Sequence, residues 1–172
     1  DPAYPAEIVS VVSNRPDAMG LDFARSHGIP AHAIDHKAFA DRVAFDAAVD
    51  RQLRAEGIEI VACAGFMRIM TKGLIDAWEG RMINIHPSLL PLYRGLDTHA
   101  RALADGVKIH GCTVHFVTPE LDAGPIIAQA AVPVLAGDTA ESLGKRVLEA
   151  EHRLYPAALA LVATGAATLV NG

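Results

Sequence analysis

Short apolar runs alternate with amphipathic stretches along most of this 172-residue chain. This alternation constrains the fold more than any other feature, because strands that alternate with helices build a mainly parallel sheet. The runs that we expect to form strands cover residues 8–12, 31–34, 58–64, 82–85, 109–117 and 126–134.

The intervening stretches have helical spacing. We expect helices at residues 18–27, 39–56, 71–78 and 98–104, with Gly28 and Gly57 as C-terminal stops. The run Asp138-Thr139-Ala140-Glu141 resembles a capping box that opens a last, longer helix. Pro156 is expected to kink or end that helix, because proline lacks the backbone N–H.

The pattern therefore predicts an α/β fold, with a mainly parallel, twisted sheet, helices on both faces and a single domain over residues 1–172. The last two strands follow each other without a helix between them. We expect them to form an antiparallel or irregular appendage at the edge of the sheet.

Composition excludes several classes of protein. Hydrophobic residues make up 51% of the chain and charged residues 20%, which is typical of a folded globular protein. The net charge of -5 argues against nucleic-acid binding, and no apolar run approaches the roughly 20 residues that span a membrane. Two cysteines indicate neither a disulfide framework nor a zinc ribbon, so we expect a reducing compartment, and no histidine spacing predicts a metal site.

Polar residues that follow apolar strands are the best candidates for chemistry, since α/β sheets bind ligands beyond the carboxyl ends of their strands. Asn84 and His86 lie two residues apart on a predicted strand, so their side chains point to the same side. Pro87 and Pro91 stiffen the segment that follows. This strand end therefore offers an amide and an imidazole on a rigid mount.

Asp122 lies in the loop between the last two predicted strands, two residues before Gly124. An amide, an imidazole and a carboxylate in one cleft would suit acyl transfer without a protein nucleophile. The first two can stabilise the oxygen of a tetrahedral intermediate, and the carboxylate favours the protonated imidazole. Ser88 has no nucleophile-elbow sequence around it, so a serine mechanism is not expected.

Each candidate also has a purely structural interpretation. His86 alone could be a hydrogen-bonded core histidine, and Asp122 could cap a turn. Arg42 and Arg68 could be solvated surface residues, and Met67 and Met70 could belong to the core. Glu151 could pair with Lys145 or Arg146 on its own helix. His110 and His115 lie five residues apart on one strand and so face opposite sides, which makes a poor metal pair.

Residues 84–91 closely resemble the signature of the folate-dependent formyltransferases, as does the stretch Leu121-Asp122-Ala123-Gly124-Pro125. Three further segments resemble the phosphoribosylglycinamide formyltransferase branch of that family. They cover residues 64–70, 111–117 and 151–156. The resemblance extends over nearly the whole chain, in order and with family-like spacing, and it implies a Rossmann-like fold.

The resemblance also implies an activity, which is transfer of the formyl group of 10-formyltetrahydrofolate to the amine of glycinamide ribonucleotide in purine biosynthesis. It implies that Asn84, His86 and Asp122 are catalytic, that Glu151 orients the substrate amine and that Pro87 contacts the same substrate. The positions that match folate-binding residues of the family are Arg42, Met67, Arg68, Ile69, Met70, Asn84, Thr118, Pro119, Glu120, Leu121 and Asp122.

Two departures from the family pattern stand out. Family members begin with a strand and a Gly-Ser-Asn loop that binds the substrate phosphate. No such segment precedes Asp1, and we expect it to be missing from the sequence rather than from the natural protein. Pro119 stands where an acidic residue is common, and it has no N–H to donate.

Alternative functions remain at this point. A formyltetrahydrofolate deformylase would share the Asn-x-His and Asp pattern, and a folate-binding module without activity is the non-enzymatic alternative. A formyltransferase for initiator tRNA would need a further domain and a basic surface. The expected partners are glycinamide ribonucleotide and reduced folate only, with no metal, nucleic acid or membrane. We expect a cytoplasmic monomer or homodimer.

Overall fold

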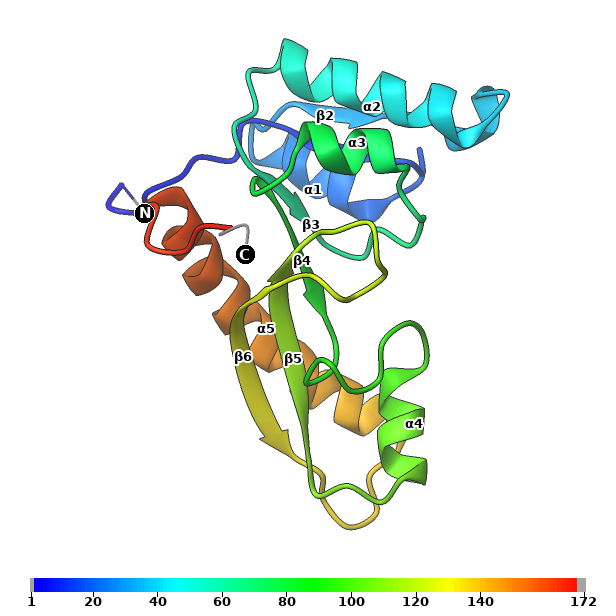
Figure 1. Ribbon diagram of the computed structural model, residues 1–172, viewed down its shortest axis with the longest axis vertical. Coiled ribbons are helices and arrows are strands. Elements are labelled where there is room, and N and C mark those ends of the chain that lie inside the picture. The colour runs from blue at the N-terminus through cyan, green and yellow to red at the C-terminus, as the bar shows by residue number, and fades with distance from the viewer. Residues whose placement is uncertain (1, 170–172) are drawn as a thin grey trace. The chain divides into compact units, whose positions relative to one another are not determined.

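The computed structural model describes residues 2–169, in which helices and strands alternate along the chain (Figure 1). Its strands are β1 (Val11–Ser13), β2 (Ala31–Ala33), β3 (Val61–Cys63), β4 (Met82–His86), β5 (Ile109–Phe116) and β6 (Ile126–Pro133). Its helices are α1 (Met19–Ser26), the short 3-10 helix η1 (His36–Ala38), α2 (Arg42–Ala55), α3 (Lys72–Ala77), α4 (Thr98–Ala104) and α5 (Ala140–Ala163). The predicted α/β class is confirmed, and each expected strand and helix has a counterpart.

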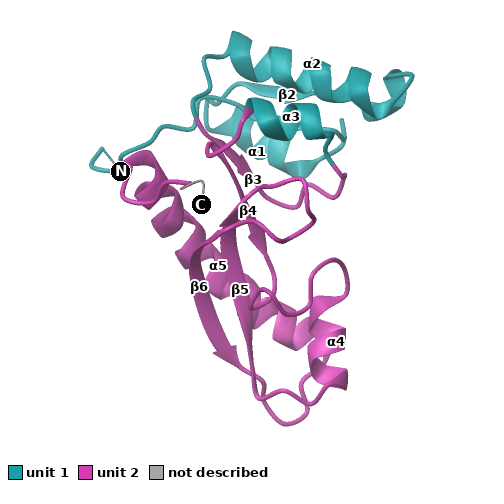
Figure 2. Cartoon of the chain, in the orientation of Figure 1, with its two compact units in different colours: residues 1–59, 70–77 teal, residues 60–69, 78–172 magenta. Residues whose placement is uncertain are grey.

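The chain divides into two compact units (Figure 2). The first comprises Asp1–Glu59 and Met70–Ala77, and the second comprises Ile60–Ile69 and Trp78–Gly172. The single domain expected over residues 1–172 stays a prediction.

The first unit is built on a parallel pair of strands, β1 and β2, with Val11 opposite Ala31. Helix α1 packs against both strands through Leu21 and Ala24, which are buried. The first strand begins three residues later than expected, and Ile8 is largely exposed. Apolar composition alone therefore misplaced the start of this strand.

The second unit holds a four-stranded sheet in the order β3-β4-β5-β6. Strands β3 and β4 are parallel, whereas β4 and β5, and β5 and β6, are antiparallel. The antiparallel edge expected for the last two strands is confirmed. A loop without a helix connects β5 to β6, so the chain reverses direction and β6 pairs with β5 in antiparallel fashion.

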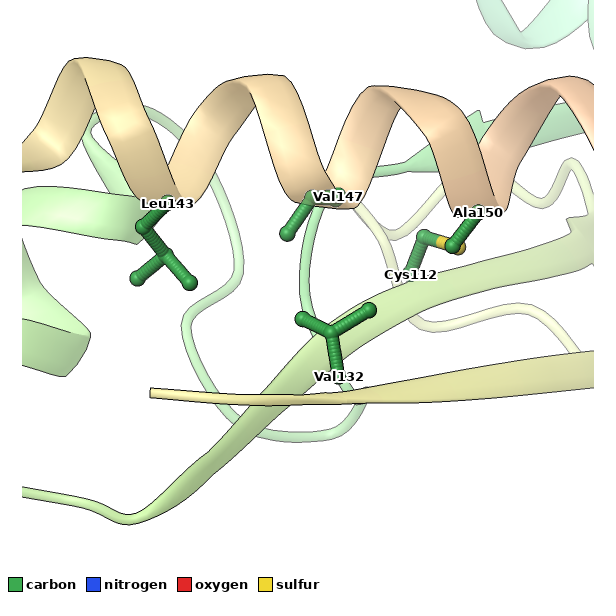
Figure 3. Packing of buried hydrophobic residues seen from close by; sticks show 5 residues of the cluster. All are labelled: Cys112, Val132, Leu143, Val147 and Ala150. Carbon is green, nitrogen blue, oxygen red and sulfur yellow. The ribbon is translucent and has the colours of Figure 1, made fainter. Parts of the chain in front are cut away.

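Helix α5 packs against β4, β5 and β6 and supplies much of the core of this unit. Figure 3 shows the cluster where the helix meets the sheet, made by Cys112, Val132, Leu143, Val147 and Ala150. Leu143, Val147 and Ala150 recur at helical spacing, so one face of α5 is apolar and buried. No helix within residues 2–169 is both long and apolar enough to cross a membrane.

A glycine permits the close approach of β5 and β6. A Cβ atom at Gly111 would lie 2.0 Å from the carbonyl oxygen of Ala130 on β6. No residue with a Cβ atom can be accommodated at such a distance, so this position of β5 must be a glycine.

The N-terminus of α5 is capped differently from the expected pattern. Thr139 and Ser142 form the capping box, each side chain accepting a hydrogen bond from the other's backbone N–H. Arg146 forms a bidentate ion pair with Asp138, with N–O distances of 2.7 and 3.0 Å. The hydrogen bonds from Arg146 hold the pKa of the Asp138 carboxyl well below its usual range. Arg146 also donates to the carbonyl of Pro133, which ties the end of β6 to the helix.

Of the two outcomes expected at Pro156, a kink or an end of the last helix, the end is wrong, because α5 continues to Ala163. Proline removes one intrahelical hydrogen bond but still adopts helical φ. Ala158, two residues beyond the proline, is fully buried in a second cluster with Ile83, Val114 and Phe116. Tertiary packing on both sides of Pro156 therefore outweighs the lost hydrogen bond.

This packing predicts a contrast between two leucines on α5. Leu143 is fully buried, whereas Leu148 is 48% exposed. Leu143→Ala should lower the free energy of unfolding by about 3 kcal/mol, because it leaves a cavity between the helix and the sheet. Leu148→Ala should cost less than about 1 kcal/mol. Urea denaturation of both variants measures the difference, and equal losses would contradict the assigned faces.

Candidate functional site

The centre of the candidate site is the carboxyl end of β4, in the second unit. Strand β4 has the sequence MINIH and is flanked by β3 and β5. The register places Asn84 opposite Cys63 on β3 and His115 on β5. Asn84 and His86 thus sit on an inner strand, where the sheet holds the backbone on both sides.

Asp122 comes to His86 from the loop between β5 and β6. Its Oδ2 atom lies 3.4 Å from Nδ1 of His86, and both side chains are less than 10% exposed. Asp122 adopts a left-handed backbone conformation (φ 49°), which a non-glycine residue rarely adopts without support from its surroundings. The carboxylate and imidazole predicted from the sequence to converge are therefore neighbours in a buried setting.

Gly124 lets the loop turn close to the sheet. A Cβ atom at this position would lie 1.8 Å from the carbonyl oxygen of Phe116, so only glycine fits. The N–H of Phe116 in turn donates to the carbonyl of Pro125. The sequence Asp-Ala-Gly-Pro thus fixes where Asp122 stands relative to the end of β5.

The second ring nitrogen of His86 is also occupied. Nε2 lies 2.9 Å from the carbonyl oxygen of Tyr93, and because a carbonyl only accepts, Nε2 must carry a proton. Nδ1 is therefore the ring nitrogen that faces Asp122. Asp122 has a further donor, the backbone N–H of Gly95, at 2.8 Å from Oδ2.

His115 forms a polar cluster with Asn84, His86 and Asp122, although the sequence suggested no role for it. Its Nδ1 lies 2.9 Å from the carbonyl of Phe116, which makes Nδ1 the protonated nitrogen. Nε2 then faces the side-chain nitrogen of Asn84 at 3.4 Å and lies 4.0 Å from Oδ1 of Asp122. Burial lowers the pKa of His115, so a neutral ring accepts from Asn84 and fixes how that amide points.

The segment after His86 is fixed by side chains from β5 and β6. Thr113 donates to the carbonyl of Ser88 at 2.7 Å and accepts from the N–H of Leu90. Gln129 donates to the carbonyl of Leu90 at 3.0 Å. Ser88 itself is fully buried and donates to the carbonyl of Leu92, so its hydroxyl is used in holding the turn.

Glu151 lies half-buried on α5. Burial raises its pKa, and the neighbouring His152 partly opposes this. Within residues 2–169, Lys145 pairs with Glu141 and Arg146 pairs with Asp138, so these ion pairs do not support the structural interpretation of Glu151 as their partner.

The residues matching the family's folate positions fall in both units. Met67, Arg68 and Ile69 follow β3, and the side chains of Met67 and Ile69 are largely exposed rather than part of a core. In the loop after β5, the hydroxyl of Thr118 donates to the carbonyl of Glu120. The Glu120 side chain pairs with Arg94 at 2.8 Å. Pro119 and Leu121 are exposed. Arg42 and Met70 belong to the first unit, whereas Asn84, His86, His115 and Asp122 belong to the second.

Two further histidines, His99 and His110, contact each other in the second unit. Nε2 of the buried His110 is 3.2 Å from Nδ1 of His99 on α4, and its ring contacts the ring of Tyr93. Burial, followed by the charges of His99 and His86, lowers the pKa of His110 to about 4, and a hydrogen bond with the backbone of Pro87 acts in the opposite direction. Within residues 2–169, no three His, Cys, Asp or Glu side chains are grouped as metal ligands.

Comparison with known proteins places this geometry in context. The formyl transferase family matches residues 1–159. The chain is 55% identical over 161 residues to the trifunctional purine biosynthetic protein adenosine-3 of Gallus gallus, covering 94% of this chain and 16% of that relative. It is 46% identical over 156 residues to phosphoribosylglycinamide formyltransferase of Escherichia coli (strain K12), covering 91% of this chain and 74% of that one.

The fold is shared with solved structures as well. The structure of phosphoribosylglycinamide formyltransferase (purN) from Coxiella burnetii, in complex with CHES, has a TM-score of 0.94 and 44% identity, and the match covers 99% of this chain and 80% of that one. The predicted Rossmann-like α/β fold is confirmed by this likeness. The chain spans 16% of the length of the trifunctional chicken relative.

The low pKa of His110 predicts how stability depends on pH. Between the ordinary pKa of about 6.5 and the folded value of about 4, the unfolded chain binds a proton that the folded chain does not. The free energy of unfolding should therefore fall as the pH drops through this range, by on the order of 2 kcal/mol from His110.

Denaturation curves measured between pH 4 and pH 7 test this, since His110→Gln should flatten the dependence. The exposed His27 provides the control, because His27→Gln should leave the slope as it is in the natural protein. An equally steep slope in His110→Gln would contradict the low pKa.

Proposed function

The chain belongs to the formyl transferase family, and we propose that it transfers the formyl group of 10-formyltetrahydrofolate to the primary amine of glycinamide ribonucleotide. The names of its relatives support this choice of reaction. The observation that carries the chemistry is the buried pair of His86 and Asp122, whose facing atoms are 3.4 Å apart, at the end of the strand that bears Asn84.

The reaction requires direct attack of the substrate amine on the formyl carbon. A bond forms between the amine nitrogen and this carbon, and the bond from the carbon to N10 of the folate then breaks. The amine loses a proton and the folate nitrogen gains one. The formyl group keeps its oxidation state throughout, so neither an oxidant nor a reductant is needed.

The side chains available as nucleophiles support direct attack over a covalent intermediate. The Ser88 hydroxyl is buried and committed to the carbonyl of Leu92. Burial raises the pKa of the Cys63 thiol to about 12 and, together with the charge of Glu151, that of the Cys112 thiol to about 11. Both sulfurs therefore stay protonated near neutral pH, and a thiol is a poor nucleophile.

Asn84 and His86 would stabilise the negative oxygen of the tetrahedral intermediate. Asn84 offers its side-chain N–H, and His86 offers Nδ1–H, since Nε2–H is engaged by Tyr93. Donors aimed at a developing oxyanion in a buried site each contribute about 10²–10³ in rate. Because the neutral His115 accepts from Asn84, it supports the orientation of that amide.

Asp122 would stabilise the positive charge on His86 and relay protons. Its Oδ2 accepts from Gly95 and faces Nδ1 of His86, which places one carboxylate beside the nitrogen that exchanges a proton. Positioned proton transfer typically contributes about 10²–10⁴ in rate. A water between carboxylate and folate nitrogen would complete the path.

We assign binding of the two substrates to the remaining predicted residues. Glu151, whose pKa is raised by burial, and Pro87 would contact glycinamide ribonucleotide. The largely exposed apolar side chains of Met67 and Ile69 suit a flat ring such as the pterin. The full set proposed for the folate is Arg42, Met67, Arg68, Ile69, Met70, Asn84, Thr118, Pro119, Glu120, Leu121 and Asp122.

We further propose a cytoplasmic monomer or homodimer that acts on these small molecules without a metal. Both cysteines are free thiols, which agrees with a reducing compartment.

The choice between transferase, deformylase and binding module depends on one assay. Full-length protein is mixed with 10-formyltetrahydrofolate, with and without glycinamide ribonucleotide, and release of tetrahydrofolate is followed by absorbance. We expect release only when the amine is present. Release without the amine, together with formate, would identify a deformylase, and no release under either condition would leave a folate-binding module.

Substitution of the buried pair tests the assigned roles. His86→Ala should slow single-turnover formyl transfer by about 10²–10³, because it removes an oxyanion donor. Asp122→Asn keeps an acceptor for Gly95 but loses the charge, and should slow transfer by about 10² or more. His27→Ala, at an exposed position, is the control. A wild-type rate in His86→Ala would exclude a catalytic role for this ring.

A further inference from the structure

One short stretch of backbone, residues 93–96, contacts both members of the buried pair. The carbonyl of Tyr93 accepts from Nε2 of His86 at 2.9 Å. Two residues later, the N–H of Gly95 donates to Oδ2 of Asp122 at 2.8 Å. The position of this stretch therefore sets the orientation of the imidazole and of the carboxylate together.

The stretch does not hold its shape through a β-ladder or a helix. It lies between β4 and α4, in the part of the chain without regular structure. Tyr93 has a φ of 57°, and Asp97, which precedes α4, has the same value. A non-glycine residue in this region is disfavoured by its own Cβ, so contacts from outside the stretch must maintain it.

Arg101, on α4, makes several of those contacts. Its Nη1 atom donates to the carbonyl of Arg94 at 2.6 Å and to the carbonyl of Leu96 at 3.3 Å, one on each side of Gly95. Its guanidinium carbon lies 5.5 Å from the centre of the Tyr93 ring. One side chain thus reaches the residue that holds His86 and brackets the residue that holds Asp122.

We infer that Arg101 is a positioning residue for the formyl transfer proposed above. Its hydrogen bonds go to the backbone carbonyls of residues 94 and 96. It acts by holding residues 93–96 so that Tyr93 and Gly95 orient His86 and Asp122. The ion pair of Arg94 with Glu120 is a second tie on the same stretch, but both of its side chains are exposed, and such pairs contribute little.

Two replacements of Arg101 separate positioning from simple packing. Arg101→Met keeps an unbranched side chain of similar helix propensity but removes every donor. Arg101→Lys keeps three donors on one nitrogen, and both observed bonds come from a single nitrogen, so an ammonium could make both. Arg51→Met is the matched control, since Arg51 is an exposed helical arginine on α2.

Single-turnover and steady-state rates give the first readout. A shift of about 1 Å at a reacting group can cost about 10²-fold, so Arg101→Met should slow transfer by about 10- to 100-fold. The KM values for both substrates should stay within about twofold, because no binding contact is removed. Arg101→Lys should retain at least about a third of the natural rate, and Arg51→Met all of it.

A double variant tests whether Arg101 acts through the ring. In a His86→Ala background, Arg101→Met should cause a smaller further loss than in the natural protein, since one of its two targets is gone. The same further loss in that background as in the natural protein would overturn the inference. A rate in Arg101→Met equal to that of the natural protein would also overturn it. So would equal rates in the lysine and methionine variants, because both lose the stacking of the guanidinium on Tyr93 and differ in their hydrogen-bond donors.

A readout without activity keeps this inference separate from the proposed function. In ¹⁵N NMR spectra, the Nε2 proton of His86 should exchange slowly with water in the natural protein and in Arg101→Lys, and faster in Arg101→Met. If the protein fails to formylate glycinamide ribonucleotide while this signature holds, the proposed reaction is wrong and the positioning role of Arg101 stands. Unchanged exchange in Arg101→Met would overturn that role.

Discussion

The buried contact between His86 and Asp122 is the constraint on which the rest of the second unit depends. A carboxylate and an imidazole that leave water lose solvation, and they persist only when each polar atom finds a partner. Here the sheet supplies the position of the ring, the loop after β5 supplies the acid, and the backbone of residues 93–96 supplies an acceptor and a donor. Glycine at position 124 and the hydrogen bonds of Thr113 and Gln129 serve the same end, because they fix the loops that carry these partners.

The order of the elements and the main site residues could be predicted from the sequence, because both depend on patterns between residues that are close along the chain. The alternation of apolar runs and helical spacing gave the order of strands and helices, and Asn84 and His86 stood out because they follow a strand at a spacing of two. Asp122 stood out because a polar loop followed a buried strand. The resemblance of these segments to one family then identified them as a group.

The remaining features depend on contacts that spacing does not encode. His115 is brought to Asn84 by the register between β4 and β5, which no single strand reveals. The carbonyl of Tyr93 and the N–H of Gly95 are backbone groups, so the residue types at those positions carry no signal. The expectation of a kink or an end at Pro156 rested on local propensity, which does not include the packing of Ala158 against the sheet.

The two protonated, buried sulfurs have a practical consequence. Thiol reagents and peroxide attack the thiolate, and neither Cys63 nor Cys112 provides one near neutral pH. Toward such reagents, these 172 residues therefore behave nearly as a chain without cysteine. A single cysteine introduced on an exposed loop would be the preferred attachment point for a fluorophore or spin label, and labelling of the native pair would report transient opening of the core.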